Sequence, residues 1–350
     1  MSFCVRIQST NRKFMVEAGE SILDAALRQG IALPYSCRDG ACGSCRGRIL
    51  TGSVHYQRAL PPARGAGETS RGEALFCQAQ PDSDLVIAAN EIEAASQLSV
   101  KRLPCRVASI ERLSHDVMRV QLSLPPTERL QFLAGQYIDV LLKDGRRRGF
   151  SIANAPEDDA FIELHIRHVP GGSFTHHVFH DMKPRAMLRI EGPLGGFYLR
   201  EDSQRPVILM GGGTGYAPLK GILEHAFHLN ERRAMHLFWG VRSRRDLYHQ
   251  DLIESWLTQH AHFQYTPVLS EPMAEDQWEG ETGFVSDILL EYYPDLSGHD
   301  VYMSGPPAMI EAARTLFLKH GLPEIRMFSD AFEFAADTRN KAAQVGLPTA

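Results

Sequence analysis

Four cysteines have the spacing of ligands to an iron–sulfur cluster. Three of them form a C-x4-C-x2-C pattern in the stretch CRDGACGSC, and the fourth follows after 31 intervening residues: Cys37, Cys42, Cys45 and Cys77. This is the ligand pattern of a plant-type 2Fe-2S cluster, through which electrons pass one at a time. The small residues between the first three cysteines let backbone N–H groups approach the cluster sulfur atoms. The sequence therefore predicts a one-electron metal centre in its first quarter.

Two other uses of these thiols fit the spacing less well. Structural zinc usually takes two pairs of ligands at short spacing, whereas three thiols here lie in one nine-residue stretch. A disulfide framework belongs to exported proteins, and the N-terminus lacks the basic and then apolar layout of a signal peptide. The remaining cysteines, Cys4 and Cys105, lie in strand-like runs, where a buried and unreactive thiol is expected.

The elements around the cysteines resemble the ferredoxin domain of iron–sulfur flavoprotein reductases. A helical pattern over residues 20–29 ends at Gly30, a residue type that commonly stops helices. Strand-like runs precede and follow the cysteine loop, at residues 3–7, 13–16, 46–50 and 84–88. Together these elements predict a β-grasp fold for the first block of the chain.

The composition is typical of a soluble globular protein. Hydrophobic residues make up 43% of the chain and charged residues 23%. The net charge of −5 gives no reason to expect nucleic acid or a membrane surface as a partner. No run approaches the roughly 20 apolar residues of a membrane span. A cytoplasmic location is therefore expected.

The chain divides into three blocks that differ in periodicity. After the ferredoxin-like block, short alternating segments broken by Pro and Gly predict an antiparallel β-barrel. Apolar strands that alternate with helical stretches then predict a parallel sheet with crossover helices. The expected architecture is multidomain, α+β and α/β, with a loose tail at the end, and its boundaries are 1–93, 101–202, 205–334 and 335–350.

The second block contains the stretch RGFS, which resembles a signature of the ferredoxin-NADP reductase superfamily. A guanidinium can hold a phosphate through two hydrogen bonds, and an aromatic ring can lie along a flavin. The resemblance implies that Arg148 binds the flavin phosphate and that Phe150 lies along the isoalloxazine. It also implies that Ser151 forms a hydrogen bond near the flavin N5 and takes part in the reaction.

Two further segments of this block match the same superfamily in order and spacing. The stretch PGGSFT resembles its pyrophosphate loop, and the resemblance implies contacts from Gly172 and Thr175. The stretch GPLGGF begins at Gly192 and resembles the segment that closes the barrel. The three motifs together predict a flavin. FAD rather than FMN is implied by the relatives that carry the ferredoxin domain first.

Five histidines gather in the same block, and a metal site is one interpretation of such a group: His165, His168, His176, His177 and His180. We expect them in strand and turn, without a paired carboxylate. Partly exposed or stacking imidazoles are therefore the favoured interpretation.

The third block begins with a strand that runs directly into GGGTGYAP and then a helix. Glycines let the backbone approach a pyrophosphate, and free N–H groups at the helix N-terminus favour its negative charge. This stretch and the later VYMSGPPAM resemble the two nucleotide motifs of the superfamily. The resemblance implies nucleotide contacts from Gly211, Gly212, Gly213, Thr214, Gly215, Pro218, Gly305 and Pro306.

Two residues of the third block are expected to act at the reacting atoms. Ser304 stands where relatives commonly have a cysteine that faces the nicotinamide. Asp330 stands in place of the usual glutamate in a segment that resembles the part of the fold returning to the flavin. That segment ends near Phe332, which the resemblance places beside the cofactor.

The choice of nucleotide is expected to depend on Ser270 and Glu271. NADPH-dependent members of the superfamily have a Ser-Arg pair at this point, where the guanidinium holds the 2′-phosphate. A carboxylate repels that phosphate and accepts hydrogen bonds from the ribose hydroxyls of NADH. NADH is therefore expected in preference to NADPH. The opposing argument comes from three arginines after the second strand of the block, which would favour NADPH if they reached its 2′-phosphate: Arg242, Arg244 and Arg245.

The three blocks together imply an electron-transfer chain. A nicotinamide donates two electrons as hydride and a 2Fe-2S cluster accepts one, and a flavin converts between them. Residues 1 to about 334 resemble reductase components of multicomponent oxygenases, and within that group the CDP-6-deoxy-Δ3,4-glucoseen reductases. The resemblance implies electron flow from NADH through FAD and the cluster to a dehydrase or oxygenase component. A redox-sensing or scaffold subunit is the alternative, and steady NADH turnover with an artificial acceptor distinguishes the two.

The charge of the ferredoxin-like block bears on how it meets its acceptor. Ten basic and ten acidic residues fall within residues 1–95, so this block is neutral, whereas free plant-type ferredoxins are acidic. Arg38, Arg46 and Arg48 lie beside the predicted ligands. We hypothesise that these arginines meet acidic groups on the acceptor.

Overall fold

The computed structural model describes residues 2–36, 38, 40, 43–57, 72–89, 91 and 98–332. The chain forms two compact units: Met1–Val100 with Leu194–Phe197, and Lys101–Pro193 with Tyr198–Ala350. Two of the predicted cluster ligands, Cys37 and Cys42, and the predicted tail at 335–350 lie outside the described residues.

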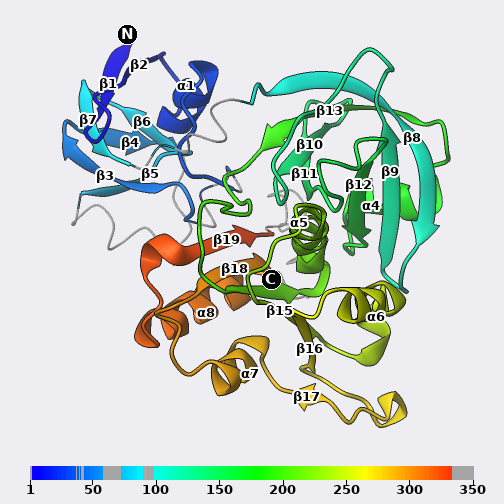
Figure 1. The fold of residues 1–350 in the computed structure, drawn as a ribbon. Helices are drawn as coiled ribbons and strands as arrows, with labels where there is room; N and C mark the ends of the chain where they lie inside the picture. The colour runs from blue at the N-terminus through cyan, green and yellow to red at the C-terminus, as the bar shows by residue number, and fades with distance from the viewer. Residues whose placement is uncertain are drawn as a thin grey trace. The chain divides into compact units, whose positions relative to one another are not determined.

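The first unit contains the elements expected of a β-grasp fold (blue and cyan in Figure 1). They are β1 (Phe3–Ile7), β2 (Lys13–Val16), α1 (Ile22–Arg28), β3 (Arg46–Thr51), β4 (Val54–Tyr56), β5 (Glu73–Leu75), β6 (Ala79–Pro81) and β7 (Leu85–Ala88). The main sheet has the order β2-β1-β7-β3-β5, and β1 and β7 are parallel. Helix α1 begins after Ser21, whose Oγ accepts the N–H of Asp24 at 3.1 Å and so caps the helix.

The second block folds into an antiparallel barrel (Figure 1). Its elements are β8 (Lys101–Arg112), β9 (Val117–Ser123), β10 (Tyr137–Leu141), β11 (Arg147–Ser151), β12 (Ile162–Arg167), α4 (Ser173–His180) and β13 (Met187–Leu194). The strand order is β11-β10-β13-β8-β9-β12. An isolated bridge between Ile152 and Leu164 joins the two outer strands and closes the sheet. The predicted barrel is confirmed.

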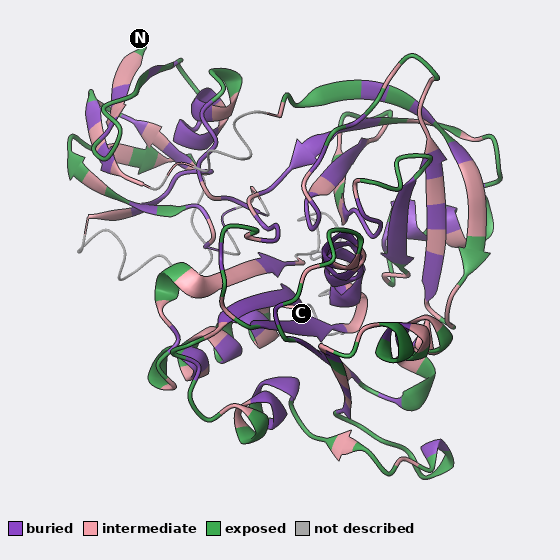
Figure 2. Ribbon diagram, in the orientation of Figure 1, coloured by how far each residue is buried: buried purple, intermediate pink, exposed green. Residues whose placement is uncertain are grey.

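The third block is a parallel sheet flanked by helices. Its elements are β14 (Val207–Gly212), α5 (Tyr216–His228), β15 (Met235–Val241), α6 (Gln250–Gln259), β16 (Phe263–Leu269), β17 (Glu281–Thr282), α7 (Val285–Tyr292), β18 (Asp300–Gly305), α8 (Pro307–Lys319) and β19 (Met327–Ala331). The order β17-β16-β15-β14-β18-β19 is parallel throughout. Strands β14 and β18 are buried along their whole length (Figure 2).

The order of the parallel strands places the nucleotide motifs together. From β14 the chain proceeds outward through β15 and β16, and it returns to the other side of β14 with β18. The carboxyl ends of β14 and β18 are therefore neighbours at the point where the direction of winding reverses. Ligands of open α/β sheets bind at such a point. Both nucleotide motifs include the carboxyl end of one of these two strands and the turn after it.

The structure corrects the expected placement of the histidines. His176, His177 and His180 lie in helix α4 and not in strand or turn. Phe174 and Val178 are buried and four residues apart, so the apolar period of this segment is helical. The expected lack of carboxylate partners is also wrong, since His165 contacts Glu163 and His177 lies 3.5 Å from Asp181.

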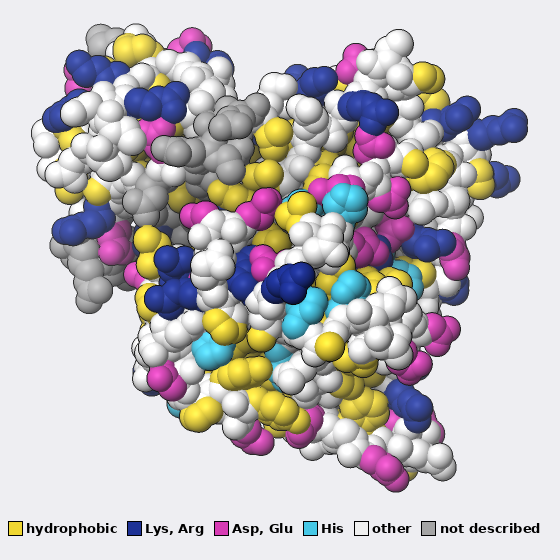
Figure 3. Space-filling view, in the orientation of Figure 1, with side chains coloured by type: hydrophobic (Ala, Val, Ile, Leu, Met, Phe, Trp, Pro, Cys, Tyr) yellow, Lys and Arg dark blue, Asp and Glu magenta, His cyan; other side chains and the backbone are white. Residues whose placement is uncertain are grey.

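Charged groups are distributed without a dominant sign. Basic and acidic side chains are interspersed over the face drawn in Figure 3, in keeping with the net charge of −5. None of the helices in the described part of the chain has the length and apolar content needed to cross a membrane.

Candidate functional site

The two described cysteines of the predicted cluster lie side by side. Cys45 directly precedes β3 and Cys77 follows β5, and these strands are paired antiparallel. Their Sγ atoms are 3.2 Å apart and both residues are buried. A disulfide bond is about 2.05 Å long, so no disulfide joins these two sulfur atoms. Two thiolates on one tetrahedral metal, with bonds of about 2.3 Å, lie about 3.8 Å apart. A small adjustment therefore lets the pair bind one metal atom.

The loop before Cys45 has the features that an iron–sulfur cluster requires. Gly40 and Gly43 adopt the left-handed conformation, with φ of 79° and 73°, which strains other residue types. Ser44 Oγ is buried and, among the described residues, has no hydrogen-bond partner. A buried hydroxyl without a partner is costly and fits a site where a further acceptor binds. The residues of this loop therefore fit a 2Fe-2S cluster held in part by Cys45 and Cys77.

The other two cysteines behave as structural thiols. Cys4 is half-buried in β1, and Cys105 is buried in β8. Burial raises the pKa of Cys105 to about 12, so its reactive thiolate is scarce at neutral pH. The expectation of an unreactive thiol is met at Cys105.

Strand β11 carries the three residues predicted to hold the flavin. Arg148 and Phe150 are two positions apart and share one face of the strand, while Ser151 points to the other. Phe150 is half-buried, and its ring centroid lies 5.6 Å from that of Phe174 in α4. A half-buried aromatic ring and a guanidinium on one face of a strand fit a flavin and its phosphate.

The predicted pyrophosphate loop is a tight turn that leads into α4. Gly172 precedes the helix, and no side chain caps the free N–H groups of the first turn. An added Cβ at Gly172 would lie 2.8 Å from Thr175 Oγ1 and 3.0 Å from the Val169 carbonyl, so only glycine fits. Thr175 Oγ1 accepts the N–H of Val169 at 3.1 Å. The hydroxyl therefore shapes the loop, and the open helix N-terminus is the feature that fits a phosphate.

Gly192 has a packing role in β13. A Cβ there would lie 2.7 Å from Ile138 Cγ2, so glycine allows β13 to approach β10 closely. Gly192 also precedes the cis-proline Pro193.

The first nucleotide motif forms the turn between β14 and α5. Gly211 and Gly212 end the strand, Gly213–Gly215 form one 3-10 turn, and α5 begins at Tyr216. The helix therefore starts within GGGTGYAP and not after it as predicted, and Pro218 lies in its first turn. Thr214, within the 3-10 turn, is half-buried. No side chain caps the N-terminus of α5, which leaves N–H groups for an anion.

The second nucleotide motif packs directly against the first. A Cβ at Gly215 would lie 2.0 Å from the Ser304 carbonyl, and one at Gly305 would lie 3.0 Å from the Gly212 backbone. Pro306 precedes α8, whose N-terminus also has no side-chain cap. Ser304 is fully buried, and its Oγ has no hydrogen-bond partner among the described residues. These glycines and this unpartnered hydroxyl fit a nucleotide bound across the two turns.

The three residues predicted to act at the reacting atoms converge although they are distant in sequence. Ser151 Oγ in β11 donates a hydrogen bond to Asp330 Oδ2 in β19 at 3.1 Å, and both groups are buried. Asp330 is the register partner of Ser304 in the neighbouring strand β18. The N–H of Phe332 donates to the Gly305 carbonyl at 2.9 Å, which holds the segment beside the nucleotide motif. The contact between Ser151 and Asp330 thus joins the flavin motif to the nucleotide motif.

Comparison with known protein families accounts for all three blocks. Residues 5–82 match the 2Fe-2S iron–sulfur cluster binding domain. Residues 104–198 match the oxidoreductase FAD-binding domain, and residues 209–315 match the oxidoreductase NAD-binding domain.

Relatives match the chain over nearly its whole length. The CDP-6-deoxy-L-threo-D-glycero-4-hexulose-3-dehydrase reductase of Yersinia pestis is 40% identical over 332 residues, with 95% of this chain and 99% of the relative covered. The terephthalate 1,2-dioxygenase reductase component 1 of a Comamonas species is 33% identical, with 95% and 98% covered. The crystal structure of the Amycolatopsis reductase GcoB superposes with a TM-score of 0.78 at 33% identity, with 94% and 98% covered.

The chain belongs to the iron–sulfur flavoprotein reductases. The resemblance drawn from the cysteine and glycine motifs is confirmed, as are the fold class and the three cofactor-binding domains. The reductase is an oxidoreductase whose relatives supply electrons to dehydrase and oxygenase partners.

The positions predicted to select the nucleotide lie on two adjacent loops of the reductase. Ser270 and Glu271 follow β16 and are exposed. The N–H of Glu271 donates to the Arg242 carbonyl at 2.8 Å, so the loops after β15 and β16 run side by side. Arg242 and Arg245 are exposed, whereas Arg244 donates to the Asp276 carbonyl at 3.1 Å. The carboxylate of Glu271 and the exposed guanidinium groups of Arg242 and Arg245 are therefore predicted to have opposite effects on a 2′-phosphate.

A buried charge network that the sequence did not reveal joins the barrel to the nucleotide-binding block. Lys220 Nζ in α5 lies 3.2 Å from Glu163 Oε1 in β12 and 2.8 Å from Glu224. Burial alone would raise the pKa of Glu163, but the hydrogen bond with His165 and the charge of Lys220 outweigh burial and lower it. In the sequence, only the four-residue spacing of Lys220 and Glu224 on a predicted helix indicates an ion pair of this network, because Glu163 is remote in the chain.

Two of the three arginines beside the predicted cluster ligands have partners within the first unit. Arg38 Nη2 lies 2.5 Å from Asp24 Oδ1, and Arg46 Nη1 lies 3.7 Å from Glu73 Oε2. Arg48 is exposed on β3. The hypothesis that these arginines meet the acceptor therefore has its clearest test at Arg48.

Proposed function

We propose that the reductase oxidises NADH and passes the electrons through FAD and its 2Fe-2S cluster to a dehydrase that acts on a CDP-linked 6-deoxy sugar. The main support for hydride transfer from the nucleotide to the flavin is the hydrogen bond between Ser151 and Asp330, which joins the predicted flavin-binding barrel to the predicted nucleotide-binding sheet. The relative of 40% identity, a dehydrase reductase, supports the choice of acceptor over an oxygenase component.

When bound, the nicotinamide supplies a hydride, the flavin divides its two electrons, and the cluster carries them singly. The chain orients these groups. Arg148 and the uncapped N-terminus of α4 would bind the flavin phosphates, and Phe150 would lie along the ring system. The uncapped turns after β14 and β18 would bind the nucleotide phosphates.

Ser151, Ser304 and Asp330 would position the reacting rings. They come from β11, β18 and β19, so their convergence brings the barrel and the parallel sheet to one point. The buried hydroxyl of Ser304 would meet the nicotinamide there. Because these side chains are buried, they would help to exclude water from the rings that they position.

The order of electron flow is tested by removing one cluster ligand. We expect the Cys77→Ser variant to lose its iron and its reduction of cytochrome c, while it keeps FAD and still reduces ferricyanide with NADH. The matched control is Cys4→Ser, which removes a half-buried thiol that is not a ligand. Absence of NADH turnover with either acceptor in the unmodified reductase would instead support a sensing or scaffold role.

The acceptor is tested separately. The NADH-reduced protein is mixed without oxygen with a CDP-6-deoxyhexulose 3-dehydrase or with a terephthalate oxygenase component, and reoxidation of the cluster is followed by absorbance. We expect the dehydrase to reoxidise the cluster at least about tenfold faster than the oxygenase component, the effect of about 1.4 kcal/mol in the barrier. Equal rates would refute the choice of partner without affecting the route of the electrons.

A further inference from the structure

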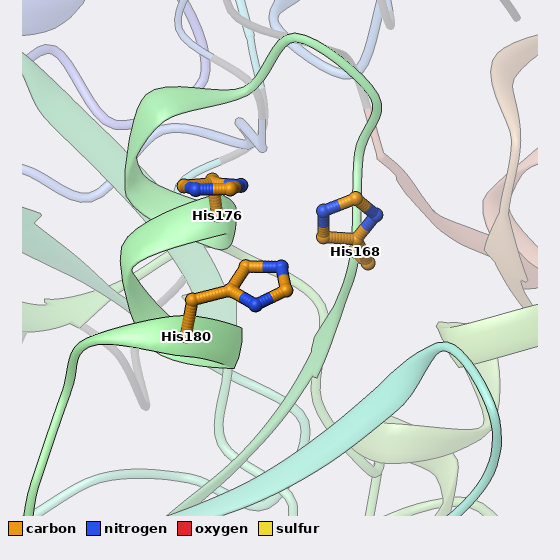
Figure 4. A group of neighbouring side chains, drawn as sticks. All are labelled: His168, His176 and His180. Atoms are coloured by element: carbon orange, nitrogen blue, oxygen red, sulfur yellow. The ribbon is translucent and has the colours of Figure 1, made fainter.

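Three histidines outside the cofactor motifs converge on one point at the edge of the barrel. His176 and His180 project from successive turns of α4, and His168 is the residue directly after β12 (Figure 4). One ring nitrogen of each lies within 4.8 Å of those of the other two. His176 and His180 are exposed, and His168 is half-buried.

The spacing in the helix is that of a metal-binding pair. Residues four apart on a helix present their side chains on the same face, and the rings of His176 and His180 have centroids 4.3 Å apart. The third imidazole comes from a separate element, and its position is fixed in two ways. The N–H of His168 donates to the Asp116 carbonyl at 2.8 Å, and its ring packs edge-on against Phe179 at 5.0 Å.

The donor set selects a class of metal. Imidazole nitrogen suits zinc, copper and nickel, whereas calcium and magnesium require oxygen ligands. Among the described residues, no carboxylate belongs to this cluster of three. The nearby Asp116 carboxylate lies 2.7 Å from Arg167 Nε, an ion pair that occupies it.

The distances require only movement of side chains. Zinc–nitrogen bonds of about 2.0–2.1 Å in a tetrahedral site place two ligand nitrogens about 3.3 Å apart. The three nitrogens must therefore approach by up to about 1.5 Å. Rotation of the exposed imidazoles of His176 and His180 supplies this movement, so the helix and strand need not shift.

We propose that His168, His176 and His180 form a binding site for one divalent transition-metal ion of the zinc class, with a fourth coordination position open to solvent. The ion would link the end of β12 to α4 and so close the loop of residues 169–172 between them. That loop is already held by the hydrogen bond of Thr175 to Val169. Because this hydrogen bond already restricts the conformations of the loop, binding an ion would cost little further conformational entropy, which favours binding.

The test measures zinc bound to the purified full-length protein in equilibrium dialysis against buffered Zn²⁺, with zinc and iron counted in the same sample. The iron count shows that zinc has not displaced the cluster. The variants His176→Gln and His180→Gln each remove one exposed ligand. The control is His177→Gln, on the same helix but outside the cluster, where the imidazole lies beside Asp181. Flavin content and circular dichroism confirm that each variant is folded.

We expect the wild type and the His177→Gln variant to bind one more zinc ion per chain than the double variant His176→Gln/His180→Gln. Each single variant should bind at least about tenfold more weakly, since loss even of an outer partner costs about 10–100-fold. Bound zinc should also protect His176 and His180, but not His177, from acylation by diethyl pyrocarbonate, read by mass spectrometry of the peptide. Equal zinc binding by the wild type and the double variant, or protection of His177 alone, would overturn the proposal.

Discussion

The hydrogen bond between Ser151 and Asp330 should control how fast the flavin is reduced. Ser151 Oγ lies 3.1 Å from Asp330 Oδ2, and the two residues are 8% and 5% exposed, so no solvent replaces the bond when it is lost. A hydrogen bond to a carboxylate contributes about 1.5–3 kcal/mol. Because each 1.36 kcal/mol is a factor of ten in rate, Ser151→Ala should slow flavin reduction about 10–150-fold.

The assay is stopped-flow mixing of the oxidised protein with NADH in the absence of oxygen, with flavin absorbance followed over one turnover. The dissociation constant for NADH, taken from the concentration dependence, should stay within about threefold of the wild-type value, because the bond joins two protein groups and not protein to nucleotide. The control Ser203→Ala removes another buried hydroxyl, one that accepts the Arg205 N–H at 3.3 Å, and should leave the rate unchanged.

A double-mutant cycle identifies the bond itself as the cause. Asp330→Asn alone should also slow the reaction, and the double variant Ser151→Ala/Asp330→Asn should be no slower than the slower single variant. The coupling energy should then be about 1.5–3 kcal/mol. If the two effects multiply instead, the residues act independently, and the argument that their contact aligns the two cofactors is wrong.

Three further outcomes follow from the charges of the reductase. Changing Glu271→Arg should raise kcat/KM for NADPH more than it lowers that for NADH, and a wild type that already prefers NADPH would show that Arg242 and Arg245 select the nucleotide. Replacing Lys220 by Met should lower the free energy of unfolding in urea by about 3–5 kcal/mol at pH 7, because Glu163 loses a buried partner, whereas Met at the exposed Lys319 should have little effect. The pKa of Glu163 in the folded protein is lowered from its ordinary value of 4.5. The ionised carboxylate therefore stabilises the folded state fully above about pH 4.5, and this contribution is lost as the pH falls through the lower folded-state pKa. The difference between wild type and Lys220→Met should therefore shrink in acid. Reversing the charge at Arg48 should slow reduction of the protein acceptor and weaken its salt dependence, with NADH–ferricyanide turnover unchanged.

The cofactor-binding domains could be predicted from the sequence because their motifs are local. The spacing of Cys37, Cys42 and Cys45 depends only on the reach of a short loop around a cluster, so it is visible in the chain itself. The glycines at 211–215 are visible for the same reason, since a backbone that must approach another closely tolerates no side chain. The turn at Gly215, where a Cβ would lie 2.0 Å from the Ser304 carbonyl, shows the constraint directly.

The local secondary structure differs from the sequence-based prediction at two places. His176, His177 and His180 were predicted in strand and turn, yet they lie in α4, whose buried residues Phe174 and Val178 form one face of the helix. Helix α5 starts at Tyr216, inside the motif GGGTGYAP after which the helix was predicted, although Pro218 lies in the motif. Proline is tolerated in the first turn of a helix, where its missing N–H has no partner in any case.

Contacts between distant segments were decided by the tertiary structure alone. Ser151 and Asp330 are 179 residues apart, and Glu163 and Lys220 come from different blocks. His168 meets His176 only because β12 ends beside α4. Each of these pairs forms when one element packs against another, and that packing depends on the summed shape and burial of many side chains. The types of residue needed for chemistry are therefore readable in the sequence, whereas their mutual distances arise only when the elements are brought together.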